Sequence, residues 1–507
     1  MKRFLGIVGF ALAPLLAETA GMAQTQASRA PNPELGKQIY RTQCAVCHGA
    51  TGAGDGAAAY LLSPRPRDFT RGSFKVRSTA TGTLPTDNDL FRTITQGMPG
   101  TAMPPWAELP DADRWALVDF LQTLSARFAE EGAGEVVAIP DPPGDLPSLA
   151  PAGKVAYEKY RCGECHGAGG RGDGPASATL KDDTGFSIRP YDFTRPGRYK
   201  GGDNPKDIYR TFTTGFDGTP MPSFGGAIPE EDRWAIVAYV RSLSTPEPAA
   251  ATLAPGEAIG AVRTASLTAD PDAPFWGRVS EYEIAMRQLW GRENVIGRVR
   301  VSAATDGKRL ALRMRWSDAS ADTRMLLPED FRDAAAVQFS LAGPDVTFAM
   351  GEPGKRVSIW HWKADWQKDL AGREDIESAE PAMVVDMYPF AHGAAAADQD
   401  RAFLTGAAAG NAFSRLKRSS PIENLVAAGI GTLTPQPAAA QNVSGKGVWS
   451  GGEWRVVFLR NLEASAGGDV RLADGIPVAF AVWNGSEGDR NGIKAVSTWY
   501  RLGLPTF

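Results

Sequence analysis

Cysteine and histidine are scarce in this sequence, with four of each in 507 residues. Basic residues are not in excess either, since 54 lysines and arginines face 58 acidic residues and the net charge is −4. A nucleic-acid binder carries a basic patch, so this balance argues against nucleic acid as a partner. Beyond Ala17, no apolar run approaches the roughly 18 to 20 residues that a membrane span needs. The length exceeds one hydrophobic core and predicts about two to four domains.

The N-terminus has the pattern of a secretory signal peptide. A basic start at Lys2 and Arg3 is followed by an apolar run from Phe4 to Ala17, and the small residues Gly21 and Ala23 fit a cleavage site after Ala23. This order of charged, apolar and small residues is typical of a removed leader rather than a membrane anchor. We therefore predict a signal peptide at residues 1–23 and an exported mature protein without a membrane span.

The four cysteines all fall in two copies of one pattern, CAVCH at residues 44–48 and CGECH at residues 162–166. C-x-x-C-H is the attachment signature of c-type haem, in which the thiolates bond to the haem vinyl groups and the histidine ligates the iron. A C-x-x-C pair alone also suits a redox couple or half of a zinc site, but no other cysteine is present to complete a zinc tetrahedron or a disulfide. The sequence predicts two covalent haem c groups, held by Cys44, Cys47 and His48 and by Cys162, Cys165 and His166.

Residues 33–245 read as two copies of one unit, because Cys44 and Cys162 are 118 residues apart (162 − 44) and several later segments recur at the same interval. In each copy a first helix leads into the motif, a glycine-rich loop follows, and a last helix shows apolar residues at helical spacing. This order resembles class I cytochromes c. The resemblance implies two all-α domains, at residues 33–128 and 151–245, separated by a linker at 129–150. The resemblance to c-type cytochromes also implies a periplasmic location.

Each haem iron needs a sixth ligand, and a methionine stands at the same place in both copies. Met103 follows His48 by 55 residues (103 − 48) and Met221 follows His166 by 55 (221 − 166), each inside Gly-Thr-x-Met-Pro. A methionine opposite a histidine raises the reduction potential of a haem. Met98 is a competitor, but its counterpart in the second copy is Phe216, which cannot ligate. We therefore predict Met103 and Met221, although a core methionine would look alike.

Beyond residue 275 the pattern changes to short alternating segments with Gly, Asp and Pro turns. These predict an antiparallel β-sandwich at residues 269–507 after a linker at 246–268. The expected strands lie at residues 299–302, 309–316, 335–341, 346–350, 356–362, 383–388, 453–459, 476–483 and 494–502. An Ala/Gly-rich segment at residues 391–411 is expected to be a long loop.

Three segments of this half, at residues 348–351, 359–366 and 492–499, resemble the haem b domain of the ethylbenzene dehydrogenase γ subunit. Related γ subunits serve dimethylsulfide dehydrogenase, selenate reductase, chlorate reductase and nitrite oxidoreductase, which are molybdenum enzymes of the DMSO reductase family. The resemblance implies one non-covalent haem b between two sheets, with Met350 and Lys494 as axial ligands. His361 is the rival, because histidine is the commoner haem ligand. Alternation along the strand points it away from the side of Trp360 and Trp362.

The resemblance also implies partners, namely an iron–sulfur β subunit and a molybdenum α subunit, with a soluble cytochrome or a membrane electron carrier at the other end. The expected function is that of a non-catalytic electron-transfer subunit. The fused dihaem module departs from the ethylbenzene dehydrogenase γ subunit and leaves the carrier open. The alternatives are a dihaem cytochrome c with a non-haem C-terminal binding module, and a dihaem oxidase or peroxidase subunit.

Overall fold

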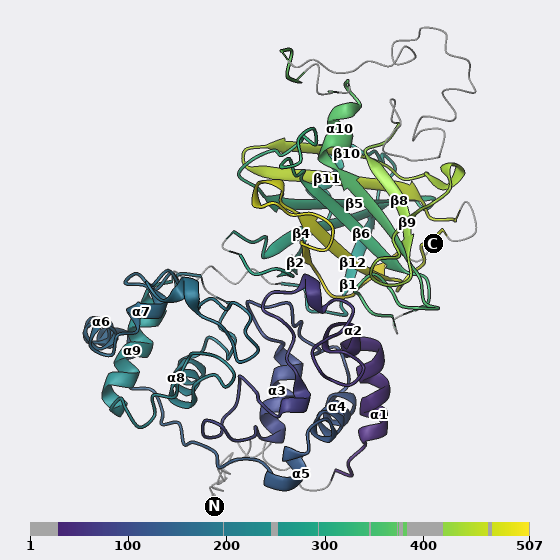
Figure 1. The fold of residues 1–507 in the computed structure, drawn as a ribbon. Coiled ribbons are helices and arrows are strands. Elements are labelled where there is room, and N and C mark those ends of the chain that lie inside the picture. Colours follow the sequence, from purple (N-terminus) through teal and green to yellow (C-terminus); the bar gives the residue numbers. More distant parts are fainter. Residues whose placement is uncertain are drawn as a thin grey trace, which may run out of the picture.

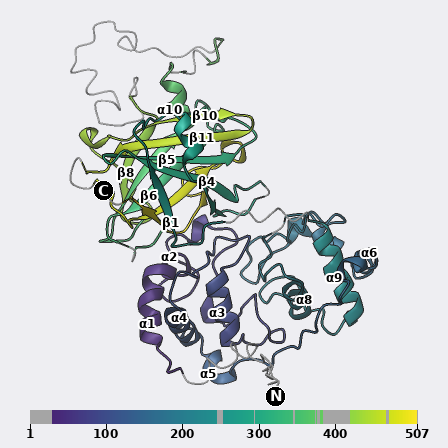
Figure 2. The ribbon, with the colours of Figure 1, turned by 180° about the vertical axis from the view of Figure 1, so that it is seen from behind.

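The computed structural model describes residues 29–195, 197–244, 252–292, 294–343, 346–372, 374, 379–382, 419–464 and 469–505. The predicted signal peptide, the expected strand at 383–388 and the expected loop at 391–411 lie outside the described residues. Two helical domains lie side by side, and a β-sandwich packs against them (Figures 1 and 2). Within the described part of the chain, every helix falls short of the length and hydrophobicity that a bilayer crossing requires.

The two helical domains repeat one arrangement. The first contains α1 (Pro33–Ile39), a π-helical turn (Tyr40–Cys44), α2 (Ala45–His48), α3 (Asp87–Gln96), α4 (Asp111–Thr123) and α5 (Arg127–Glu131). The second contains α6 (Ala150–Lys159), α7 (Gly163–His166), α8 (Pro205–Thr214) and α9 (Glu230–Ser242). Short 3-10 turns at Ala59–Leu61, Phe69–Arg71, Leu146–Leu149 and Ser177–Thr179 complete them. The predicted helical cytochrome c region is confirmed.

A glycine brings the first and last helices of each domain together. A Cβ added to Gly36 of α1 would lie 1.9 Å from the carbonyl oxygen of Ala116 in α4, and one added to Gly153 of α6 would lie 1.9 Å from that of Ala235 in α9. Only a residue without a side chain allows this approach. The helix that carries each C-x-x-C-H motif is therefore packed directly on the last helix.

The two helical domains are joined through buried polar contacts. Arg77, which is 1% exposed, donates to the carbonyl oxygen of Thr214 at 2.8 Å and pairs with Asp217 at 2.9 Å. Arg92 of α3 pairs with Asp207 of α8 at 2.6 Å. These contacts hold the two domains in one orientation.

The C-terminal domain consists of two sheets packed face to face, which confirms a mostly antiparallel sandwich. The first, called the β5 sheet, contains β10 (Ser444–Ser450), β11 (Glu453–Asn461), β5 (Arg309–Ser317), β4 (Arg298–Thr305) and β2 (Tyr282–Ala285). The second, called the β6 sheet, contains β14 (Tyr500–Gly503), β12 (Pro477–Trp483), β6 (Ala334–Ser340), β7 (Val357–Lys363), β8 (Ile422–Ala427) and β9 (Thr434–Pro435), with the short strands β13 (Ala495–Val496) and β3 (Arg287–Gln288). Helix α10 (Ala364–Asp369) follows β7, and 3-10 turns lie at Pro274–Arg278, Ala438–Ala440 and Gly485–Glu487.

Strand β1 (Ala258–Arg263) joins the two sheets, because it pairs in parallel with β14 of one and with β4 of the other. This strand lies inside the segment that the sequence analysis placed in a linker. The expected strand at 346–350 is instead a turn, since Met350 and Gly351 have φ angles of +68° and +78°, which an extended strand cannot accommodate. The expected strand at 494–502 is divided into β13 and β14.

The sandwich contacts the first helical domain at several points. The amide of Ser63 donates to the carbonyl of Leu289 at 3.1 Å, and that of Gly291 donates to Ser63 at 2.8 Å. The rings of Trp106 and Phe348 have centroids 6.2 Å apart. The first helical domain is thus in direct contact with the loop that carries Met350.

Candidate haem sites

The histidine of the first motif is held as a neutral imidazole. His48 Nδ1 lies 3.1 Å from the carbonyl oxygen of Arg67, and its ring stacks on Phe69 with centroids 4.5 Å apart. A proton on Nδ1 that is donated to this carbonyl leaves Nε2 as the free acceptor, as in most metal-binding histidines. Burial lowers the pKa of His48 to about 4, so the imidazole is neutral at physiological pH.

The second motif repeats this arrangement. His166 Nδ1 lies 3.2 Å from the carbonyl oxygen of Tyr191, and its ring stacks on Phe193 at 4.5 Å. Burial lowers the pKa of His166 as well. Both histidines thus have the same kinds of partner, a backbone carbonyl at Nδ1 and a stacked phenylalanine ring, at equivalent positions of the two domains.

Burial shifts the pKa of three of the four motif thiols upward. Burial raises the pKa of Cys44 to about 12, and it raises those of Cys47 and Cys162 to about 11. A redox-active cysteine has a lowered pKa. The alternative of a dithiol redox pair is therefore disfavoured on chemical grounds.

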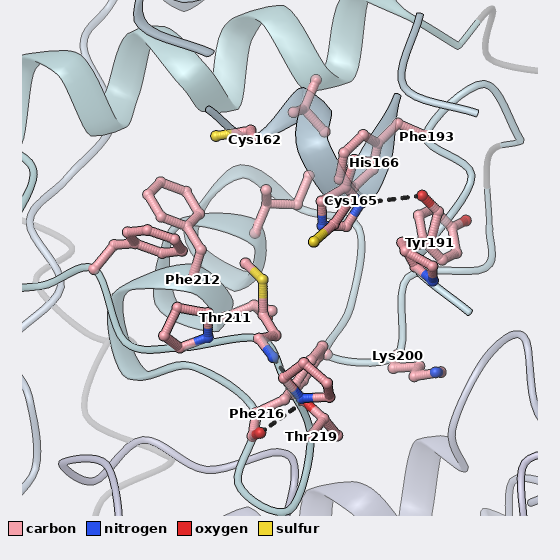
Figure 3. A pocket seen from close by; sticks show the side chains of 18 of the residues that line it. Cys162, Cys165, His166, Tyr191, Phe193, Lys200, Thr211, Phe212, Phe216 and Thr219 are labelled. Atoms are coloured by element: carbon pink, nitrogen blue, oxygen red, sulfur yellow. Dashed lines mark hydrogen bonds between the residues drawn. The ribbon is translucent and has the colours of Figure 1, made fainter. Parts of the chain in front are cut away.

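A deep apolar cavity in the second domain brings the predicted ligands of this site together. It encloses about 1370 Å³ of empty space, counting its open mouth, and Cys162, Cys165, His166 and Met221 all line it. Figure 3 shows Cys162, Cys165 and His166 on one side of this space, with Phe212, Phe216 and Thr219 across from them. These walls would fit a planar, apolar group, and His166 and Met221 would be its two protein donors.

The loops that carry the two predicted methionines have the same hydrogen bonds. The amide of Met103 donates to Thr101 Oγ1 at 3.1 Å, and that of Met221 donates to Thr219 Oγ1 at 3.2 Å. Met103 packs in the core of its domain together with Cys44, whereas Met98 is not among the residues of that cluster. The geometry thus favours Met103 over Met98.

Two lysines that the sequence analysis did not single out also line the second cavity. Lys75 comes from the first domain and Lys200 from the second. Burial, followed by the charge of Lys200, lowers the pKa of Lys75 to about 7, and burial lowers that of Lys200. An alignment of the two copies would have found them, since Phe74-Lys75 and Tyr199-Lys200 are equivalent pairs. A haem carries two propionate carboxylates, and their negative charge would stabilise the protonated form of these two lysines.

The two ligands implied for the third haem lie together, although 144 residues separate them. Lys494 Nζ is 3.9 Å from Met350 Sδ. These two side chains would be the ones to hold the iron of a haem b, whose chemistry there would be the exchange of one electron.

The surroundings of this pair suit ligation. Burial lowers the pKa of Lys494 to about 8, which increases the share of the neutral amine that binds a metal. The ammonium group lies 4.8 Å from the centre of the Trp483 ring. Among the described residues, the three non-glycine residues with positive φ are Arg161, Met350 and Asn491. Met350 is a candidate ligand, Arg161 directly precedes the haem-attachment residue Cys162, and Asn491 lies three residues before Lys494. Strained backbone tends to occur at functional sites.

This donor pair is not between the two sheets, where the resemblance placed the haem. The space between the sheets is filled by large side chains, among them Trp316, Trp360, Trp362, Phe339 and Phe458. Met350 packs instead on the outer face of the β6 sheet, with Val346, Ile359, Trp483, Trp499 and the small residues Ala334, Ala336 and Ala481. The side chains on this face are smaller than those between the sheets. It is the side at which Phe348 meets Trp106 of the first helical domain.

His361 points to the same outer face, as its alternation with Trp360 and Trp362 predicts. Its ring stacks on Trp483 at 4.8 Å, so it lies beside Lys494 rather than opposite Met350. Its Nε2 is buried without a hydrogen-bond partner. This position suits a hydrogen bond to the bound group more than axial ligation.

Comparisons with known proteins agree with this division of the chain. A family described as "Ethylbenzene dehydrogenase" matches residues 273–495, "Cytochrome C oxidase, cbb3-type, subunit III" matches residues 31–121, and "Cytochrome c" matches residues 150–244.

Two curated relatives cover about half of this chain. The chlorate reductase subunit gamma of Ideonella dechloratans is 27% identical over 46% of this chain and 79% of its own length. The dimethylsulfide dehydrogenase subunit gamma of Rhodovulum sulfidophilum is 26% identical over 45% of this chain and 72% of its own length. Among solved structures, a chain of the reducing HAO-like protein complex of Kuenenia stuttgartiensis is 44% identical, covering 42% of this chain and 96% of that chain with a TM-score of 0.41. The protein therefore consists of two cytochrome c domains followed by a domain of the ethylbenzene dehydrogenase γ-subunit type, with relatives among the γ subunits of multi-subunit oxidoreductases.

Proposed function

We propose that this chain is a periplasmic electron-transfer subunit. It would relay electrons between a molybdenum and iron–sulfur oxidoreductase and a soluble or membrane-bound carrier. The γ subunits to which it is similar belong to chlorate reductase and dimethylsulfide dehydrogenase, and the two cytochrome c domains would extend the path toward the carrier.

The single observation that carries the proposal is the contact between Lys494 and Met350, on a face that meets the first cytochrome domain. Haem, when bound, supplies an iron that exchanges one electron. The chain would hold the three irons through His48 and Met103, through His166 and Met221, and through Lys494 and Met350. Two protein donors for each iron would leave no coordination position for a substrate, which favours electron transfer over a peroxidase or an oxidase.

The residues around these donors tune and insulate the sites. Arg67 and Tyr191 fix the histidine tautomers through their carbonyls, and a methionine opposite a histidine favours the reduced iron. The apolar walls exclude water, and this also raises the reduction potential, because the oxidised site carries more charge.

Purification of the native complex under mild conditions tests the proposal. We expect an iron–sulfur subunit and a molybdenum subunit to co-purify with this chain, and the haems to be reduced or oxidised when the substrate of that enzyme is added. A chain that purifies alone, with haems that stay unchanged when mixed with the separated enzyme and its substrate, would contradict it.

A further inference from the structure

Three aspartates that belong to none of the predicted haem ligand sets gather at one end of the sandwich. Asp318 directly follows β5, Asp333 directly precedes β6, and Asp322 lies in the loop between them. Each offers a carboxylate oxygen, and these oxygens lie within 4.8 Å of one another. Figure 1 shows where β5, β6 and β12 lie in the sandwich. The loop from Asp318 to Asp333 connects its two sheets.

Two of these carboxylates are removed from water. Asp333 is 0% exposed and Asp318 is 4% exposed. Burial, with the neighbouring Asp318 next, raises the pKa of Asp333 to about 7, and burial raises that of Asp318 to about 6. Buried carboxylates are normally paired with a cation or coordinate a metal, and like charges this close repel each other.

The nearby groups do not neutralise this charge. Asp333 accepts hydrogen bonds from the amides of Asp322 at 2.7 Å and Gly485 at 2.9 Å, and from Trp454 Nε1 at 2.9 Å, and all three donors are neutral. Arg292 acts on Asp318 electrostatically, but its guanidinium already holds Asp489, with Nη2 2.6 Å from Oδ2.

One oxygen of the cluster lacks a well-formed hydrogen bond. Asp318 Oδ1 accepts from the amide of Ser320 at 3.3 Å, whereas Asp318 Oδ2 is buried and has no hydrogen bond of normal geometry. The Trp316 side chain acts on this carboxyl, but it is neutral and its Nε1 is itself left without a well-formed bond. A side chain that is 96% removed from solvent should not leave a charged oxygen unsatisfied. This second observation indicates that a ligand belongs at the cluster.

We propose that Asp318, Asp322 and Asp333 form a structural site for a calcium ion. Ca²⁺ binds six to eight oxygens at about 2.3 to 2.6 Å with flexible geometry, whereas Mg²⁺ demands a tight octahedron and usually keeps several waters. A cage of three carboxylates, two of them buried, suits the larger ion, and its members come from the end of a strand, a loop and the start of another strand. The ion fastens the loop between the sheets and, through Asp333 and Gly485, the end of β12.

Calcium-dependent stability of the full-length holoprotein tests the site. The protein is treated with a chelator, and its unfolding is followed in the far-ultraviolet with added Ca²⁺ or Mg²⁺. We expect one Ca²⁺ per chain by calorimetry. We also expect a rise of roughly 5 to 10 °C in the unfolding temperature at a hundredfold excess over the dissociation constant, with a smaller rise for Mg²⁺.

Asp322→Asn is the decisive variant, and Glu329→Gln is its control, since Glu329 is exposed in the same loop. Without calcium, Asp322→Asn should be at least as stable as the wild type, because it relieves repulsion, but calcium should no longer stabilise it. Glu329→Gln should respond like the wild type. A wild type that does not respond to calcium, an equal response to Mg²⁺, or a full response in Asp322→Asn would overturn the proposal.

Discussion

At the scale of single residues, the choice between Met103 and Met98 has a direct spectroscopic test. Met103→Ala should remove the near-infrared sulfur-to-iron band of the first haem, so that about a third of the total band intensity is lost, because Met221 and Met350 are the other two predicted methionine donors. Met98→Ala is the matched control and should leave the band unchanged, because Met98 has no methionine counterpart in the second domain. Loss of the band in the Met98 variant alone would contradict the assignment.

Lys494 is the second residue whose role is open to test. Lys494→Ala removes one donor of the Lys494–Met350 pair, so we expect the variant to lose haem b while keeping both haems c. Pyridine haemochrome spectra give the ratio of the two haem types. Lys446→Ala is the control, since Lys446 lies on the surface and pairs with Asp270 at 3.2 Å. Equal haem b content and an unchanged spectrum in Lys494→Ala would rule out Lys494 as a ligand.

A change at Lys75 tests whether this side chain of the first domain affects the haem of the second domain. A positive charge near a haem disfavours the oxidised iron, so Lys75→Gln should lower the reduction potential of the second haem. At roughly 10 Å and an effective dielectric constant of about 20, the shift is on the order of 50 mV. Lys154→Gln makes the same change of charge at an exposed position of α6 and should shift the potential much less. Spectroelectrochemical titration measures both, and equal shifts would refute a specific contact.

At the scale of elements, the sequence predicted the regular parts of the fold well. The duplicated motifs located both cytochrome domains, and the alternation around Trp360 and Trp362 placed His361 on the opposite side of β7. The sequence analysis missed β1, because this strand lies in a segment rich in Pro and Ala that resembles a linker. It also predicted a strand at 346–350, since the apolar residues there pack on a sheet without belonging to it, and the left-handed backbone at Met350 leaves no compositional signal.

The position of the Met350–Lys494 pair could not be read from the sequence either. The two residues meet because β13 extends the β6 sheet beside β12, where Ala495 pairs with Gln288 and Val482. Which face of a sandwich carries large side chains and which carries small ones depends on three-dimensional packing. Alternation along the strands does not indicate which face is turned toward the other sheet.

Strands β7 and β8 share a buried ion pair with a predictable pH dependence. Lys363 is 1% exposed and contacts Glu423, which is 4% exposed. Burial outweighs the attraction of Glu423 and lowers the pKa of Lys363. The unfolded chain therefore binds more protons than the folded one between this lowered pKa and the ordinary lysine value near about 10.4, so stability should rise with pH across that window.

Chemical denaturation at several alkaline pH values, compared with a Lys363→Met, Glu423→Gln double variant, measures this effect. The double variant removes both charges and so leaves no unpaired buried group. The difference in unfolding free energy, wild type minus variant, should increase with pH. Curves that stay parallel would show that Lys363 keeps an ordinary pKa in the folded protein.

At the scale of the whole molecule, the three candidate haem sites belong to one connected body. Arg77 and Arg92 bind the second cytochrome domain to the first, and Trp106 and Ser63 bind the first to the sandwich. The first domain is thus in contact with both others, which suits an order of sandwich, first domain and second domain along an electron path.

The haem content of the purified full-length protein tests this account most directly. Pyridine haemochrome analysis, combined with iron determination, should give two haems c and one haem b per chain, with three irons. Two haems c and no haem b, in protein that has been supplied with haem during expression, would contradict the third site and reduce the C-terminal domain to a module without a role in electron transfer.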